Sequence, residues 1–203
     1  MIAVVDYGVG NLFSLVSSLR SLGLETEVTG AAARLRSADR IILPGVGAFG
    51  SARARLDASG LIPILLEEAG QKPLLGICLG MQLLFDRSFE YGECPGLGLI
   101  PGEVTFLGDD LADKMLKVPH MGWNSLEIVR DDPLFKYFRG GEYVYYVHSF
   151  YARGCAESIL GTSQYGNVAV TGVVRRGTVW GAQFHPEKSG DAGLRLLRAF
   201  AEL

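Results

Sequence analysis

The sequence predicts an α/β protein of three layers, α/β/α, with a mixed, largely parallel central sheet. Its first 90 residues alternate short apolar runs with helical patterns, which is the rhythm of β-α-β units. After Pro95 the pattern changes to strand-like segments separated by Gly, Asp or Pro turns. The first half therefore predicts parallel strands with helices on both faces, and the second half predicts antiparallel strands that extend or flank this sheet.

Apolar spacing identifies the elements of the first half. Ile2–Val5 is a continuous apolar run, as expected for a strand that is buried on both faces. Leucine and valine then recur at helical spacing through residues 12–22, and Gly23 ends this amphipathic helix. Further runs at Ile41–Leu43 and Leu74–Ile77 each lead through glycine into a helical pattern.

Six segments of the second half are strand-like, because each is a short apolar stretch bounded by turn residues. They are Glu103–Leu107, Ser125–Val129, Tyr143–Val147, Ile159–Ser163, Val168–Arg175 and Val179–Phe184. A helical pattern returns only at Ala192–Leu203. No linker or internal repeat interrupts the chain, so residues 1–203 are expected to form a single domain.

Composition argues against several classes of protein. The net charge is -3 and no basic run is present, so we expect no nucleic-acid surface. Apolar runs such as Leu61–Leu66 are far shorter than the ~18 residues of a membrane-spanning helix, and no signal peptide follows Met1. The three cysteines, an odd number without framework spacing, indicate reduced thiols and a cytoplasmic protein.

The stretch around Cys78 predicts a nucleophile. A strand leads into Gly76-Ile-Cys78-Leu-Gly80 and then into a helix, and small residues on both sides of the cysteine permit a tight turn that exposes its side chain. The N–H of Leu79 then points to where an oxyanion would form. The alternative is a buried structural cysteine, which is the better interpretation for Cys94 and Cys155.

His185-Pro186-Glu187 supplies a candidate base and its orienting carboxylate. The residue before a proline is extended, and extended residues at i and i+2 point the same way. His185 and Glu187 are therefore expected on one face, with Glu187 holding one ring nitrogen. Alone, this tripeptide could equally be a surface turn. Its value comes from Cys78, since both segments follow strands at the edge where open α/β sheets place active sites.

Two other chemistries have weaker support. The three histidines and the cysteines show no short ligand spacing, so no metal site is expected. The glycines of residues 6–13 suggest a dinucleotide loop, but the third glycine of that fingerprint would fall on Phe13. The Pro44–Gly47 loop could offer backbone N–H groups to an oxyanion, or it could be a simple tight turn.

Together, Pro44-Gly-Val-Gly47, Gly76-Ile-Cys-Leu-Gly-Met-Gln82 and His185-Pro-Glu187 resemble the class I (triad) glutamine amidotransferase family over essentially the whole chain. The resemblance implies a flavodoxin-like fold, no cofactor and a triad of Cys78, His185 and Glu187. It also implies oxyanion donors at Val46, Gly47 and Leu79. Contacts with the substrate L-glutamine are implied for Gly47, Gln82, Ser149 and Phe150.

Three further segments resemble one branch of this family: Asp6–Leu12, Pro119–Asn124 and Tyr146–Tyr151. Members of the branch pass ammonia to a TIM-barrel cyclase subunit in a heterodimer. The cyclase forms imidazole glycerol phosphate and an aminoimidazole carboxamide ribotide (AICAR) in histidine biosynthesis. The resemblance implies that the residues that face the cyclase are Asn11, His120, Met121, Gly122, Trp123, Asn124, Tyr145 and Lys188.

From the residues alone, Pro119–Asn124 is a polar-aromatic loop in which Trp123 could belong to the core and His120 to a turn. Two other functions stay open: a stand-alone cysteine hydrolase of the same fold, such as a γ-glutamyl peptide hydrolase, and a non-catalytic partner-binding module. The glycines on both sides of Val46 make a peptide rotation easy. We therefore expect a glutaminase with low activity until its partner docks.

Overall fold

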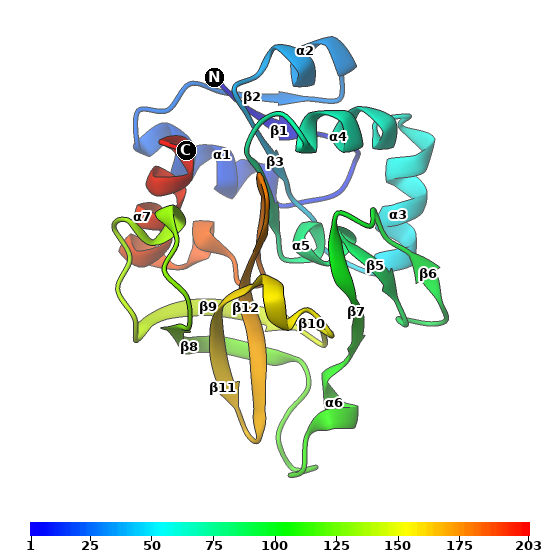
Figure 1. The fold of residues 1–203 in the computed structure, drawn as a ribbon, viewed down its shortest axis with the longest axis vertical. Coiled ribbons are helices and arrows are strands. Elements are labelled where there is room, and N and C mark those ends of the chain that lie inside the picture. The colour runs from blue at the N-terminus through cyan, green and yellow to red at the C-terminus, as the bar shows by residue number, and fades with distance from the viewer.

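Nine strands form the main sheet, in the order β2-β1-β3-β4-β13-β12-β11-β8-β9 (Figure 1). The structure, a computed structural model, describes residues 1–203. The nine strands are β1 (Ile2–Val5), β2 (Thr26–Thr29), β3 (Arg40–Leu43), β4 (Leu74–Ile77), β8 (His120–Ile128), β9 (Glu142–His148), β11 (Ile159–Tyr165), β12 (Val168–Arg176) and β13 (Val179–Ala182). Pairing is parallel from β2 to β13 and antiparallel from β13 to β9, which confirms the predicted mixed sheet.

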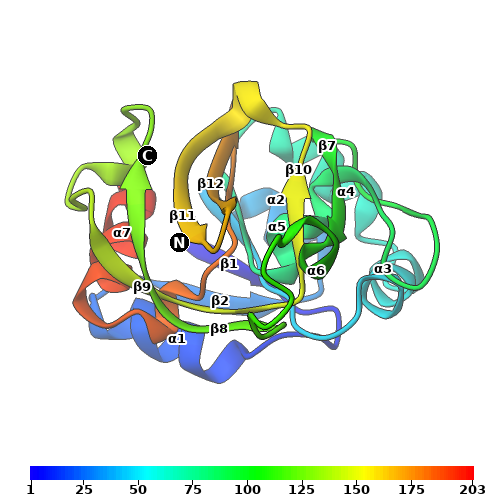
Figure 2. The same ribbon diagram turned by 90° about the horizontal axis from the view of Figure 1, so that it is seen from below.

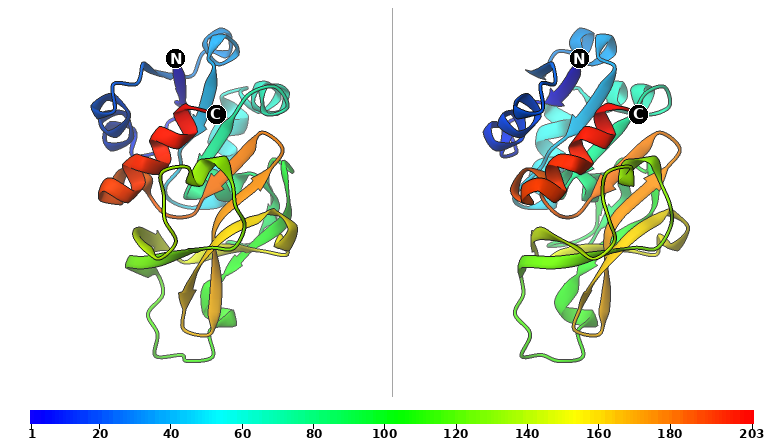
Figure 3. Two further views of the ribbon diagram at one scale, coloured as in Figure 1. Left: turned by 60° about the vertical axis from the view of Figure 1, so that its left-hand side comes forward. Right: turned by 90° about the vertical axis from the view of Figure 1, so that its left-hand side faces the viewer.

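Helices cover both faces of the parallel part. One face carries α1 (Leu12–Ser21) and α7 (Gly190–Ala201). The other carries α2 (Ala32–Ser37), α3 (Phe49–Ala58), α4 (Ile62–Ala69) and α5 (Leu79–Leu83). Figure 3 shows α1 and α7 together on one side of the sheet. The sequence prediction of an α/β/α protein is therefore confirmed.

Strand β1 shows how the sequence builds two cores. Ala3 and Val5 belong to the apolar cluster under α2–α4, whereas Ile2 and Val4 belong to the cluster under α1 and α7. Successive side chains of a strand point to opposite faces, so a strand between two helical layers must be apolar at every position. This is why the run Ile2–Val5 is continuous rather than alternating.

A second, smaller sheet flanks the main one, in the order β10-β7-β5-β6. Its strands are β5 (Phe85–Ser88), β6 (Cys94–Pro95), β7 (Ile100–Phe106) and β10 (Phe150–Arg153), and α6 (Leu107–Asp110) follows β7. Seen from below, β7 and β10 lie on the opposite side of β11 and β12 from α7 (Figure 2). Short 3-10 turns complete the structure at Pro133–Phe135, Ala156–Ser158 and Pro186–Lys188.

The antiparallel strands curl back toward the centre of the main sheet. Although β9 is the last strand in the order, the N–H of His185, just after β13, donates to the carbonyl of Tyr145 in β9 at 2.9 Å. The rings of Tyr146 and Phe184 lie 5.9 Å apart. This curl brings β9 and the residues that follow it to the carboxyl ends of β4 and β13.

Two predicted elements differ from the structure. The segment Pro119–Asn124 was expected to be a loop, but β8 begins at His120 and pairs with β9 along its length. Its large apolar side chains, Met121 and Trp123, are exposed and its polar His120 is buried, so the usual alternation of apolar inward and polar outward residues does not identify this strand. The segment Val179–Phe184 was expected among the antiparallel strands that extend or flank the sheet, but β13 lies inside the main sheet and pairs parallel with β4.

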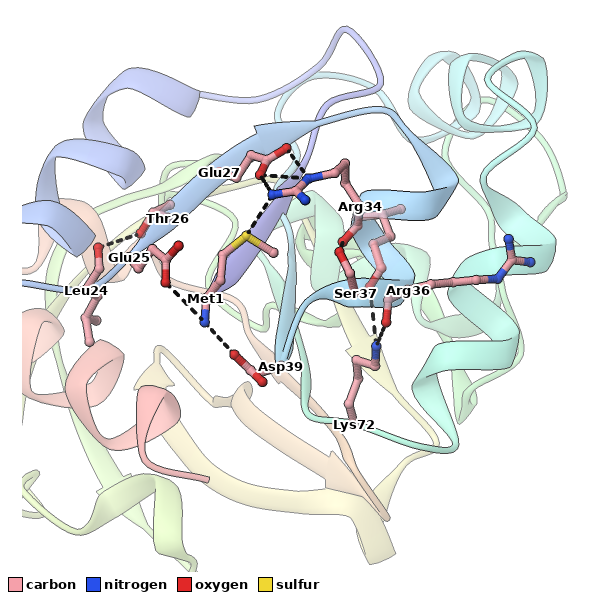
Figure 4. A network of polar contacts seen from close by, with 11 residues as sticks. Met1, Leu24, Glu25, Thr26, Glu27, Arg34, Arg36, Ser37, Asp39 and Lys72 are labelled. Carbon is pink, nitrogen blue, oxygen red and sulfur yellow. Dashed lines mark hydrogen bonds and ion pairs between the residues drawn. The ribbon is translucent and has the colours of Figure 1, made fainter.

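The amino end of the parallel strands is held by a polar network (Figure 4). The N-terminal ammonium bonds the carboxylate of Asp39 and lies 3.9 Å from that of Glu25. Arg34 of α2 donates from its Nε to both carboxylate oxygens of Glu27 in β2, at 2.9 and 3.0 Å. These exposed pairs contribute little each, but they fix β1, β2 and α2 at the end of the sheet opposite Cys78. None of the helices is long and apolar enough to span a membrane.

Candidate active site

Cys78 lies at a sharp turn between β4 and α5. Its φ is 54°, in the left-handed region that residues other than glycine rarely adopt. A Cβ atom added at Gly76 would lie 2.6 Å from the carbonyl oxygen of Gly80, and one added at Gly80 would overlap the carbonyl oxygen of Leu43. Close backbone approach therefore requires both glycines, and the resulting turn places the thiol at the carboxyl end of β4.

His185 follows β13, the parallel neighbour of β4. Ala182 pairs with Ile77, so the carboxyl ends of the two strands lie side by side. The Nδ1–H of His185 donates to Oε1 of Glu187 at 2.8 Å. A carboxylate can only accept, so this bond fixes the ring and leaves the other ring nitrogen toward the cavity that His185 shares with Cys78.

The carboxylate of Glu187 reaches His185 by a different route from the one that the sequence predicted. His185 is extended, with φ -97° and ψ 100°, but Pro186–Lys188 form a 3-10 turn. Proline at the first position of this turn suits it, because its ring fixes φ near the helical value. The turn, and not strand alternation, carries Glu187 back to the imidazole.

Ser189 fixes this turn against β9. Its hydroxyl donates to the carbonyl oxygen of His185 at 2.6 Å and accepts from the N–H of Tyr145 at 3.0 Å. The side chain is buried, so its two bonds are not exchanged with water. The imidazole is therefore held at its backbone by Tyr145 and Ser189 and at its ring by Glu187.

The charges around His185 favour its protonated form. Burial lowers the pKa of His185, whereas hydrogen bonds and charge interactions with Cys78 and Glu187 raise it, and the net effect raises the pKa to about 10. The contributions that raise this pKa come from the sulfur of Cys78 and the carboxylate of Glu187, and together they outweigh the effect of burial. The arrangement therefore favours a protonated imidazole beside the carboxylate of Glu187.

Cys78 and His185 open into one cavity of about 310 Å³ at the carboxyl edge of the sheet. Its other walls come from loops, strand ends and the helix α5: Val46, Gly47, Leu79, Gln82, Glu90, Pro119, Val147, His148, Ser149 and Phe150. This volume suits a small molecule of amino-acid size. The thiol is 7% exposed, so a bound molecule would reach it from this side only.

The arrangement matches a known family. A family model described as glutamine amidotransferase class-I matches residues 3–202. The chain belongs to the class I glutamine amidotransferase family.

Individual relatives are similar over nearly their whole length. The chain is 48% identical over 202 residues to an imidazole glycerol phosphate synthase subunit HisH from Bacillus cytotoxicus, covering 98% of this chain and 93% of the relative. It is also 48% identical over 204 residues to the subunit of the same name from Listeria monocytogenes, covering 100% and 96%.

Solved structures share the fold. A crystal structure of a glutamine amidotransferase superposes with a TM-score of 0.77 at 22% identity and covers 100% of this chain and 98% of that one. The structure of PurLQS from Thermotoga maritima has a TM-score of 0.75 at 21% identity, with 99% and 97% covered. At this identity the two likenesses show the α/β fold alone.

In this amidotransferase the predicted oxyanion loop borders the cavity. Val46 and Gly47 are exposed, and the N–H groups of both residues donate to no other group in the chain. Gly47 has φ 93°, a backbone conformation that favours glycine. The loop is therefore supplied with free donors, as an oxyanion site requires.

Gln82 ties the nucleophile turn to the wall formed by Ser149 and Phe150. Its Nε2 donates to the carbonyl oxygen of Phe150 at 2.8 Å and to Oε1 of Gln183 at 3.1 Å. Sequence reasoning missed Gln183, whose Nε2 donates to Sγ of Cys78 at 3.8 Å. Gln183 is fully buried in an apolar strand end, where one amide gives no recognisable pattern.

Sequence reasoning also missed Glu90 and His148, which line the cavity. Glu90 accepts from the N–H of Phe49 at 2.6 Å, so its carboxylate is held beside the first turn of α3. It comes from the turn between β5 and β6, which the sequence did not predict as part of the site. Glu90 is remote in sequence from the recognised motifs, and for this reason it was not predicted. A carboxylate in a cavity wall is otherwise a common binding group.

A larger hollow of about 870 Å³ lies elsewhere, beside Asp86, Arg87 and Glu103. Arg87 pairs with Glu103 at 3.5 Å and with Glu93 at 3.4 Å. No cysteine or histidine lines this hollow, so the smaller cavity that contains Cys78 is the candidate active site. No cluster of three or more potential metal ligands occurs in the structure.

The residues expected to face a partner divide into two groups. Met121 and Trp123 project from β8 and are 60% and 55% exposed. Trp123 lies edge-on to Tyr145 at 6.0 Å, and Nζ of Lys188 lies 5.8 Å from the Tyr145 ring, so these side chains form one surface patch. Gly122 lies between them, and the half-buried Asn11 lies at the start of α1, where its amide donates to the hydroxyl of Ser14 at 3.0 Å.

His120 and Asn124 lie on the inner side of the same strand. The ring of His120 is 3% exposed, which corrects the expectation that it faces a partner directly. Alternation along β8 is the reason, because Met121 and Trp123 occupy the outer positions. The amide of Asn124 is likewise bound inside the chain, to the carbonyl of Gln164 at 2.9 Å.

Replacement of Glu187 by glutamine is expected to lower kcat for glutamine hydrolysis by about 100-fold, less than loss of the nucleophile, because it disturbs the tautomer and charge of His185 but leaves both reacting groups in place. Steady-state kinetics with the partner subunit present measure this. Glu202→Gln, which removes a surface carboxylate at the end of α7, is the control. A Glu187→Gln variant with unchanged kcat would contradict an orienting role for this carboxylate.

Proposed function

We propose that this chain is the glutaminase subunit of an imidazole glycerol phosphate synthase. The observation that carries the proposal is the 48% identity, over nearly the whole chain, to subunits of that name. The class I family model and a cavity that holds Cys78 beside His185 support the chemistry. The protein hydrolyses glutamine to glutamate and ammonia, and the synthase uses the ammonia to form imidazole glycerol phosphate and AICAR.

In the first step that we propose, the Cys78 thiolate attacks the side-chain amide carbon of glutamine. The C–S bond forms, and the negative charge that develops on the amide oxygen meets the N–H groups of Gly47 and Leu79. The His185 imidazolium then gives its proton to the amide nitrogen, the C–N bond breaks, and ammonia leaves a thioester on Cys78. Because the pKa of His185 is raised, its ring carries the proton that this step needs.

In the second step the neutral imidazole of His185 takes a proton from water. The resulting hydroxide adds to the thioester carbon, and the C–S bond breaks to release glutamate and restore the thiolate-imidazolium pair. Glu187 keeps the Nδ1–H tautomer through both steps, so that the same ring nitrogen first donates and then accepts the proton.

Charge complementarity suggests how the amino acid is oriented. Glu90 supplies a carboxylate to the cavity wall, suited to the α-ammonium group of glutamine, while Gln82 and the Ser149–Phe150 backbone supply neutral polar groups. We propose that Glu90 binds the ammonium group and that the side-chain amide thereby points toward Cys78. With this recognition a substrate needs a free α-ammonium group, so a simple amide without one is expected to bind poorly.

Glu90→Gln is expected to raise the KM for glutamine by about 10- to 100-fold and to change kcat much less, since the lost charge acts on ground state and transition state alike. Glu93→Gln, on the same turn but outside the cavity, is the matched control. Steady-state kinetics over a range of glutamine concentrations measure both. Equal KM values for the two variants would rule out Glu90 as the ammonium ligand.

The partner that we propose is a TIM-barrel cyclase subunit in a heterodimer. Met121, Trp123, Tyr145 and Lys188 form an exposed patch near the active site, rich in the aromatic and apolar side chains that interfaces favour. We further propose a cytoplasmic location, consistent with three free thiols, and one glutamine amidotransferase domain over residues 1–203.

A reconstitution experiment distinguishes this function from its rivals. The purified chain is assayed for glutamine hydrolysis alone, with a cyclase subunit, and with the cyclase and its nucleotide ligand. The proposal expects a heterodimer by size-exclusion chromatography and turnover that rises at least tenfold on reconstitution. Full activity of the isolated chain would favour a stand-alone hydrolase instead. Binding without hydrolysis of glutamine would favour a non-catalytic module.

A further inference from the structure

Two buried histidines take no part in the mechanism above. His120 on β8 and His148 on β9 are register partners on adjacent strands and are 3% and 6% exposed. Nδ1 of His120 lies 3.1 Å from Nε2 of His148, and Nδ1 of His148 lies 2.9 Å from the carbonyl oxygen of Phe150. The pair therefore forms one continuous polar chain that ends in the wall of the active-site cavity.

The end at Phe150 fixes the direction of this chain. A carbonyl oxygen can only accept, so Nδ1 of His148 carries a hydrogen. In a neutral His148 ring Nε2 is then bare and must accept, so Nδ1 of His120 is the donor between the two rings. Nε2 of His120 is left as an acceptor, and the amide nitrogen of Asn124 lies 3.3 Å from it.

The amide of Asn124 is itself fixed in the orientation that the chain requires. Its Nδ2 also donates to the carbonyl of Gln164 at 2.9 Å, and its Oδ1 accepts from the N–H of Ser125 at 2.9 Å. A flipped amide would lose both bonds. Each hydrogen bond from Asn124 to Phe150 can therefore point in one direction only. An added proton on either imidazole would remove an acceptor nitrogen and break one of these hydrogen bonds.

The surroundings keep both rings neutral. The ring of His120 lies between those of Tyr146 and Tyr165, with centroids 4.7 and 4.2 Å away. Burial lowers the pKa of His120 to about 4. Burial, and then the positive charges that His120 and His185 would carry, lower the pKa of His148 to about 3, although the Phe150 carbonyl acts in the opposite direction.

We propose that His148 is a positioning residue for glutamine, which holds the carbonyl of Phe150, and with it the Ser149–Phe150 backbone, in the orientation that the cavity needs. The same carbonyl accepts from Gln82 at 2.8 Å, so two donors from different elements fix it. The inference rests on the proposed function, in which this backbone contacts the substrate. His120 acts one step further back, because its Nδ1–H compels His148 to present its own Nδ1–H to Phe150.

The chain also links the site to the outer face of β8. His120 and Asn124 occupy inner positions of the strand whose outer positions carry the exposed Met121 and Trp123. A partner that shifts or stiffens this strand therefore acts on Phe150 through two rings and three hydrogen bonds. This provides a physical connection between a docked partner and the glutamine-binding wall.

Kinetics of the reconstituted complex test the positioning role. His148→Phe keeps an aromatic ring but removes the donor, and it is expected to raise the KM for glutamine about tenfold, with kcat within about threefold of wild type. His148→Asn places an amide N–H close to the original Nδ1, so its KM is expected to return to within about threefold. His120→Phe is expected to give a smaller rise in KM than His148→Phe, since it frees His148 to adopt the other tautomer.

Val144→Ala is the matched control, a buried change on the same strand that does not line the cavity. It is expected to lower thermal stability without raising KM. A His148→Phe variant with wild-type KM, or one that the asparagine variant fails to rescue, would overturn the proposal. So would a fall in kcat with KM unchanged.

A second measurement does not depend on the glutaminase assay. Nitrogen NMR of the full-length protein with labelled imidazoles is expected to show the Nδ1–H tautomer for both His120 and His148. An Nε2–H tautomer of His148 would refute the inferred series of hydrogen bonds. If the wild-type complex hydrolyses no glutamine, the proposed function fails while the tautomers can still be as inferred. If it is active and the His148 variants match wild type, the inference alone fails.

Discussion

Replacement of Cys78 by alanine is expected to lower glutamine hydrolysis by the reconstituted complex at least about 10⁴-fold. In the proposed mechanism the thiolate is the group that bonds to the substrate carbon, and apart from Cys78 only Ser149 brings a thiol or hydroxyl to the cavity. Removal of the Sγ atom therefore removes the covalent route itself. Release of glutamate from glutamine, followed with a coupled assay, measures the effect.

The same variant has an internal control. Cyclisation driven by added ammonia is expected to proceed as in the wild type, because the substitution leaves the surface patch of Met121, Trp123 and Tyr145 unchanged. Cys94→Ala, at a half-buried cysteine that does not line the cavity, is expected to keep full glutaminase activity. Substantial turnover of glutamine by Cys78→Ala would refute the assignment of the nucleophile.

The second large effect is expected for Gly80→Ala, which is predicted to destabilise the protein by about 3 kcal/mol or more. Gly80 lies in α5, where alanine would by propensity alone be favoured by about 1 kcal/mol. The added Cβ would, however, overlap the carbonyl oxygen of Leu43, a backbone atom that cannot move without disturbing β3 and Pro44. The steric cost therefore exceeds the gain in helix propensity. Urea unfolding measures the net change in the free energy of unfolding.

Gly50→Ala is the matched control, because Gly50 lies in α3 with nothing within 4 Å of the added Cβ. Here propensity acts unopposed, and a gain of about 0.5 kcal/mol is expected. The same substitution at two helical glycines is thus expected to change the free energy of unfolding in opposite directions. If Gly80→Ala were as stable as the wild type, the close approach of α5 to Leu43 would be contradicted.

Apolar runs and glycines were sufficient to predict the parallel strands β1, β3 and β4 and the turn at Cys78, whereas β2 was not predicted and β13 was expected among the antiparallel strands. Ile2–Val5 and Leu74–Ile77 have no polar position, and such a short apolar run beside glycine is typical of a strand covered on both faces. Gly76 and Gly80 lie on both sides of Cys78 at a predicted strand–helix junction, so the sequence alone indicates a tight turn there. Local rules decide these features, and for this reason the sequence predicts them.

Features that depend on neighbours distant in sequence were missed. The strand β8 is recognisable only from its partners, because β9 pairs with His120–Leu126 and β11 pairs with Glu127 and Ile128. Gln183 and Glu90 belong to the site because the curl of the antiparallel strands and the turn between β5 and β6 close around Cys78. Alternation predicted a shared face for His185 and Glu187, but the proline-initiated 3-10 turn determines how they meet.

The position of β13 has a consequence for the synthesis of the protein. This strand is synthesised after all its neighbours in the sheet, yet it lies between β4 and β12 in the middle of the sheet. Until it arrives, the edge of β4 that pairs with β13 is unpaired and open to other chains, and His185, which follows β13, is not beside Cys78. Such non-local pairing is slow. A nascent chain therefore cannot release ammonia before its sheet is closed, and chains truncated before β13 are expected to aggregate.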